Sequence, residues 1–138
     1  MKSLVRLFLI ATLGLLINTA TFAQMEEGKK VEKMSWDEAK DAFHEVMAGT
    51  FHPVQEGDFM PLKEQYKGLI KAAKNWKMTS IPNTLDGKML SEKLEKLYVD
   101  SSGLGEMVKN KASDAELKKA IYALHDVFHD IVGLCEEH

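Results

Sequence analysis

The strongest constraint on the fold of this 138-residue sequence is the spacing of apolar residues near its C-terminal end. They recur there in alternating steps of four and three, which places them on one face of a helix. The positions are Leu117, Ile121, Leu124, Phe128, Ile131 and Cys135. Ser113 and Glu116 come just before them with the spacing of a capping box, in which each residue satisfies a backbone N–H of the other. The pattern predicts an amphipathic helix that begins after Ser113.

An earlier segment carries the same signals. Ser35 and Glu38 form a second capping box. The apolar residues that share one helix face after it are Trp36, Ala39, Phe43, Val46 and Met47. We expect this helix to end at Gly49 and the His52–Pro53 step, because a residue before proline resists the α conformation.

Two further helices are predicted between these segments. One begins near Asp58 or Pro61, and its apolar stripe consists of Leu62, Tyr66, Leu69, Ala73 and Trp76. The other runs from about Asp86 to Asn110, and its stripe consists of Leu90, Leu94, Leu97, Ser101, Leu104 and Val108. The glycines at 103 and 105 weaken its middle, so we expect a kink or a close helix contact there.

No segment shows the sustained apolar–polar alternation of a β-strand. Four amphipathic helices with short connections predict an all-α fold, an antiparallel up-down-up-down four-helix bundle over residues 35–138. Residues 24–34 lack apolar periodicity and are expected to form a flexible lead-in.

The first 23 residues have the pattern of a secretory signal peptide. Lys2 and Arg6 precede a short apolar run, and Thr21-Phe22-Ala23 ends the segment with small residues at the two positions that a signal peptidase reads. We therefore expect a periplasmic or secreted protein without membrane association after cleavage.

Charge and motifs exclude several function classes. The formal net charge of −3 is unlike that of a nucleic-acid-binding protein. The sequence contains no nucleophile elbow, phosphate-binding loop or zinc-protease motif, so we do not expect an enzyme. The single cysteine, Cys135, has no partner for an internal disulfide, and its core position favours a packed thiol. A homodimer through the Cys135 region stays open as an alternative.

The histidines are the remaining candidates for chemistry. His125 and His129 lie one turn apart on the last predicted helix, so their imidazoles are neighbours and can bind one transition metal. They lie on the flank of the apolar stripe, where the helix meets a neighbouring helix or water.

Two residues of the first helix and one that follows it are further candidates for this site. In an antiparallel bundle, His44 is expected at the height of about Val127, midway between His125 and His129. His52 is a fourth candidate ligand. If the first helix continues past it, however, it stands about 12 Å from His44 along the helix axis. Asp41, one turn before His44, is a candidate oxygen ligand or an acceptor that orients an imidazole.

By its architecture and the Leu-His-Asp-Val-Phe-His stretch from Leu124 to His129, the chain resembles exported four-helix bundles. These include the c-prime and b-type cytochromes and periplasmic metal-responsive bundles. The Cys-x-x-Cys-His motif of covalent haem attachment is missing here. The resemblance implies two alternatives: a metal site, or non-covalent haem b with Met47 and a histidine of the last helix as axial ligands.

The sequence favours a metal-binding bundle for buffering, sensing or resistance, with His44, His125 and His129 as ligands. Zinc is the expected ion, and copper and nickel are close alternatives because neutral imidazole suits all three. A haem-binding electron carrier is the second hypothesis, and an interaction module without a cofactor is the third.

Overall fold

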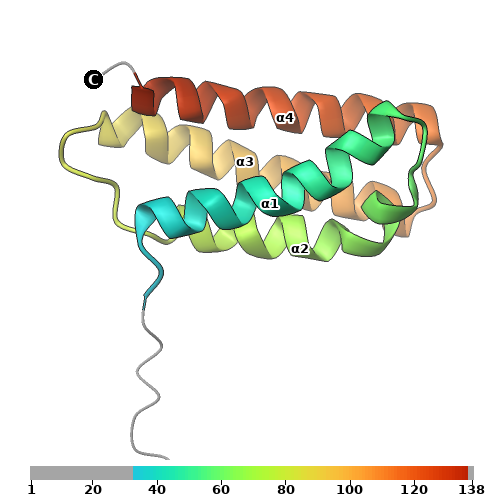
Figure 1. Cartoon of the computed structure of the whole chain (residues 1–138), viewed down its shortest axis with the longest axis horizontal. Helices are drawn as coiled ribbons and strands as arrows, with labels where there is room; N and C mark the ends of the chain where they lie inside the picture. The colour runs from blue at the N-terminus through green and yellow to red at the C-terminus, as the bar shows by residue number, and fades with distance from the viewer. Residues whose placement is uncertain (1–32, 137–138) are drawn as a thin grey trace, which may run out of the picture. The chain divides into compact units, whose positions relative to one another are not determined.

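The computed structural model describes residues 33–136, which form four helices and no strand. The helices are α1 (Trp36–Gln55), α2 (Met60–Lys77), α3 (Gly87–Lys109) and α4 (Asp114–Glu136) (Figure 1). The predicted all-α four-helix bundle is confirmed. The expected signal peptide (1–23) and the lead-in up to residue 32 lie outside the described residues.

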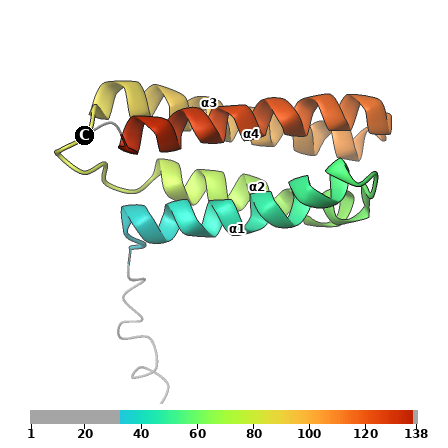
Figure 2. The same cartoon turned by 45° about the horizontal axis from the view of Figure 1, so that its top comes forward.

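Each helix packs against the next one in the chain, and α4 also contacts α1 (Figures 1 and 2). Residues further along α1 contact residues nearer the start of α4: Phe43 packs on Phe128, whereas Phe51, eight residues later, packs on His125. The backbones of α1 and α4 approach each other less closely than those of the other neighbouring helices. Aromatic side chains therefore fill much of the space between them.

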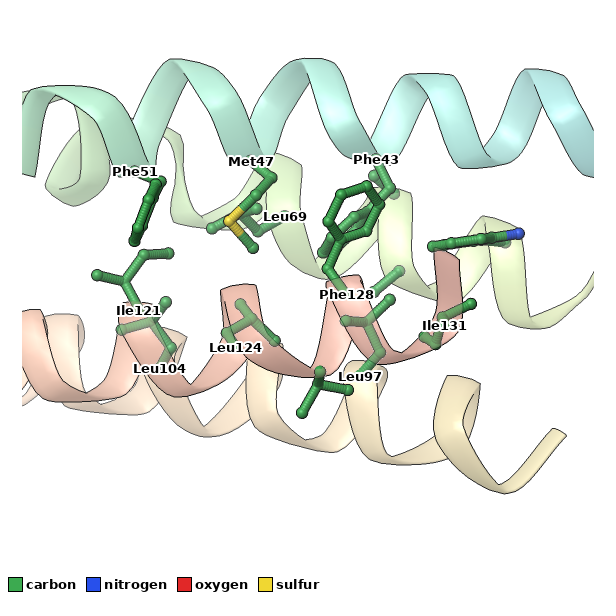
Figure 3. Close-up of a cluster of buried hydrophobic side chains, with 14 of the residues drawn as sticks. Phe43, Met47, Phe51, Leu69, Leu97, Leu104, Ile121, Leu124, Phe128 and Ile131 are labelled. Atoms are coloured by element: carbon green, nitrogen blue, oxygen red, sulfur yellow. The ribbon is translucent and has the colours of Figure 1, made fainter. Parts of the chain in front are cut away.

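Most of the core comes from the apolar stripes that the sequence predicts, one from each helix, and the unpredicted residues Phe51, Val54, Ala72 and Val127 complete it. Figure 3 shows Phe43, Met47 and Phe51 pointing from α1 toward α4. The largest fully buried side chains are Trp76, Phe43, Met47, Leu62, Leu69, Leu90, Leu94, Leu97, Leu104, Leu117, Ile121 and Leu124. None of the described helices is both long enough and apolar enough to cross a membrane.

The predicted end of α1 is wrong. The helix passes Gly49 and the His52–Pro53 step and continues to Gln55, with Pro53 inside its last turn. Phe51 and Val54 are both buried in the core. Burying these two apolar side chains favours the extra turn and outweighs the local cost of proline.

The signal that ends α1 is Gly57. Its φ of 90° is a left-handed conformation that glycine adopts without a Cβ penalty. Its N–H donates to the Val54 carbonyl at 3.1 Å, and the Asp58 N–H donates to the Pro53 carbonyl at 2.9 Å. These are the two hydrogen bonds of a Schellman motif, which satisfies free carbonyls at a helix end.

Of the two alternatives expected for the middle of α3, the close helix contact is present. A Cβ atom built on Gly105 would lie 2.7 Å from Ile70 Cδ1 and 3.0 Å from Tyr66 Cδ2. The same atom on Gly103 would meet nothing within 4 Å. Gly105 therefore lets α2 and α3 approach closely.

Candidate functional site

His125 and His129 form a pair of imidazoles on α4. Their Nε2 atoms are 3.2 Å apart, within hydrogen-bonding distance, and their ring centroids are 4.4 Å apart. One ring then donates its N–H and the other accepts, according to their tautomers. The one-turn spacing on a regular helix brings the two rings together.

Phe51 of α1 orients His125. The two rings are stacked, with centroids 3.9 Å apart and planes 6° from parallel. Tyr122, one turn before His125 on α4, packs edge-on against the same phenyl ring at 4.8 Å. This cluster fixes the plane of the His125 imidazole, so that its Nε2 atom lies toward His129.

His44 lies at nearly the expected height on α1, beside Phe128 of α4. The two rings are stacked at 5.4 Å with planes 8° from parallel. The α1–α4 seam thus contains two stacked pairs, each formed by a histidine of one helix and a phenylalanine of the other. Because its ring lies flat on Phe128, His44 does not converge with the α4 pair.

His52 and Asp41 lie on the exposed side of α1. The His52 Nδ1 atom is 3.1 Å from Gln55 Oε1, which engages the ring within its own helix. Since α1 continues through His52, the rise of about 12 Å over eight residues separates it from His44. Within residues 33–136, no three histidine, cysteine or carboxylate side chains are gathered to hold a metal ion. The expected three-histidine cluster is therefore a pair in this structure.

The pKa of His125 is lowered, first of all because burial disfavours the charged imidazolium. Positive charge on His129 lowers it further, and charges on His52 and His44 have smaller effects in the same direction. Asp126 acts in the opposite direction. The lowered pKa favours the neutral ring, the form that binds metals.

Met47 occupies the core between α1 and α4 and is 1% exposed. Phe51, one turn further along α1, covers the face of His125. Met47 thus points from α1 into the apolar core (Figure 3), whereas His125 is half-buried and His129 is exposed on α4. This packing does not fit a haem between them.

Cys135 is half-buried near the start of α1, as its predicted place on the apolar stripe of α4 implies. Burial raises the pKa of its thiol, which disfavours the reactive thiolate. Cys135 therefore behaves chiefly as a small apolar side chain.

Phe51 is part of this site, although the sequence patterns do not predict it there. The step to Pro53 placed Phe51 at the expected helix end, outside the α1 stripe. The signal that could have found it is the four-residue spacing from Phe43 through Met47 to Phe51, followed by the stop at Gly57.

Comparison of this chain with protein-family models, with curated proteins and with solved structures finds no match. The candidate site therefore rests on its own geometry.

Proposed function

We propose that this chain binds a divalent transition metal, zinc first, through the Nε2 atoms of His125 and His129. Its role would be metal buffering, sensing or resistance in the periplasm or outside the cell. The observation that carries the proposal is the 3.2 Å separation of the two nitrogens.

That separation suits a shared metal ion. Two nitrogens that each lie about 2.0–2.1 Å from one zinc ion are about 3.1–3.4 Å apart at near-tetrahedral angles. Binding needs both Nε2 lone pairs, so the ring that donates the hydrogen bond must move its proton to Nδ1. Moving this one proton converts the hydrogen-bonded pair into a chelate.

The environment of the pair supports this chemistry. The lowered pKa of His125 favours its neutral ring, so a metal ion competes less with a proton for that nitrogen. The stacked Phe51 ring holds the imidazole plane and reduces the entropy lost on binding. Copper and nickel remain alternative ions because imidazole suits them equally well.

The histidine pair fills two coordination positions of the zinc ion. Water can occupy the remaining positions, and His44, His52 and Asp41 stay candidates if their side chains change rotamer. Haem b with Met47 is the weaker alternative, since the core packing around Met47 does not favour it.

The test is a zinc titration by isothermal calorimetry on the wild type and on His129→Ala. We expect the substitution to lower zinc affinity at least about tenfold, because even outer-shell changes at metal sites have effects of this size. Helical circular dichroism should stay nearly unchanged, since His129 is exposed. Lys119→Ala, exposed on the same helix, is the matched control and should bind zinc like the wild type.

Equal zinc affinity in His129→Ala and the wild type would contradict the proposal. A Soret band in the purified protein would instead favour haem. A colourless protein that binds neither metal nor haem would leave the interaction module.

A further inference from the structure

We propose that zinc bound at His125 and His129 joins two copies of this chain through the partly exposed flank of α4 that carries this pair, beside α1, with each copy supplying two imidazoles. This inference rests on the proposed function, since it uses the same histidine pair. The occupant of the α4 face is therefore a second copy of the chain, held by a shared ion.

The coordination chemistry leaves room for the second copy. Structural zinc is almost always four-coordinate, and one histidine pair provides two nitrogens. His129 is exposed and His125 is half-buried, so the pair faces solvent at the surface of α4. His44 and His52 are engaged on α1, by Phe128 and by Gln55 respectively.

The positions of two charged residues on the same face are those that a two-fold axis through the ion would require. Successive residues turn by about 100°, so Lys118, the histidine pair and Glu136 lie within about 40° of one another around α4. Val127, which is buried on another side of α4, is midway between the two histidines in the sequence and marks their level along the helix axis. Lys118 comes nine residues before Val127 and Glu136 nine residues after it, and both are exposed.

A two-fold axis perpendicular to α4 at the level of Val127 would make the two α4 helices antiparallel. Lys118 of each copy would then lie opposite Glu136 of the other. The pairing occurs twice and brings unlike charges together, so this face is complementary to itself.

The shape of the face fits the same arrangement. A shallow hollow of about 430 Å³ lies beside the pair and is lined by Met89, Lys93, His129, Asp130, Gly133 and Leu134. A Cβ atom on Gly133 would meet nothing within 4 Å, so glycine helps to keep this surface open. Tyr122 lies five residues before Val127 and Gly133 six residues after it. The half-exposed Tyr122 ring of one copy, which packs edge-on against Phe51 of its own chain, would therefore come level with the hollow of the other.

The test combines sedimentation velocity with a calorimetric zinc titration of the purified protein. We expect one zinc ion per two chains and a doubled mass, both reversed by a chelator. One zinc ion per chain at unchanged mass would overturn the dimer and leave the proposed function standing. Absence of zinc binding would overturn both. A doubled mass without zinc, or in His125→Ala, would also overturn the inference.

A charge exchange tests the geometry of the dimer. Lys118→Glu and Glu136→Lys would each place like charges opposite one another twice, and each should weaken zinc-dependent dimerisation by about threefold or more. The double variant restores unlike pairs and should recover most of the loss. Lys119→Glu, about 100° further around the helix, is the matched control. The two-fold arrangement would be contradicted if the single charge reversals left zinc-dependent dimerisation unchanged. It would also be contradicted if the double variant dimerised more weakly than either single variant.

Discussion

The first residues of α1 and α4 stabilise these helices through reciprocal hydrogen bonds. At α4, the Ser113 N–H donates to Glu116 Oε2 at 2.8 Å, and the Glu116 N–H donates to Ser113 Oγ at 3.3 Å. Ser35 and Glu38 make the same two bonds at the start of α1. Both capping boxes are local patterns, so the sequence predicts them correctly.

These bonds predict a loss of stability in acid. Hydrogen bonding from the Ser113 side chain and backbone holds the pKa of Glu116 below its usual value. A carboxyl whose pKa is lowered on folding adds stability above its unfolded pKa of about 4.3 and loses it as the pH falls through the folded value. Glu116→Gln should therefore lessen the decline of the unfolding free energy between about pH 5 and pH 3.

Urea denaturation across this pH range checks the prediction, and Glu45→Gln, exposed on α1, is the control. If Glu116→Gln and the wild type decline equally with acid, the capping carboxylate does not contribute as the structure implies.

At the scale of elements, the α2–α3 contact depends on the missing side chain of Gly105. Gly103 and Gly105 are close in sequence, and both weaken the intrinsic helix preference of α3. Only at Gly105 does a neighbouring helix occupy the space that a Cβ atom would need. The sequence predicts that something unusual happens in this segment, but only the packing distinguishes the two glycines.

Alanine substitutions at these glycines should have opposite effects. Gly105→Ala should lower the free energy of unfolding by about 1 kcal/mol, because the Ile70 methyl group and the Tyr66 ring must both shift. Gly103→Ala should raise it by up to about 1 kcal/mol, since alanine favours the helix and meets no neighbour. Chemical denaturation of both variants measures the difference. A stabilised Gly105→Ala protein would show that the contact is looser than described.

The end of α1 shows where local rules give the wrong element boundary. Pro53 disfavours a helix locally, but Phe51 and Val54 gain more from burial against the rest of the bundle. That gain depends on the position of α4, which the sequence of α1 does not contain. Gly57, by contrast, marks the true end through its own backbone conformation.

At the scale of the whole molecule, the seam between α1 and α4 determines what the histidines can do. Apolar periodicity was enough to predict four helices and most of the core, because each stripe must be buried. The His125–His129 pair follows from helix geometry alone. The stacking of His44 on Phe128 and of His125 on Phe51 depends on rotamers and on helix separation, so spacing could not predict it.

The most direct test of the central claim identifies the nitrogen atoms that bind zinc. Long-range ¹H–¹⁵N correlation spectra of histidine-labelled protein report the state of each imidazole nitrogen during a zinc titration. We expect Nε2 of both His125 and His129 to take on the metal-bound signature together, with the proton of each ring on Nδ1. Zinc saturation that leaves both Nε2 signals unchanged would contradict it.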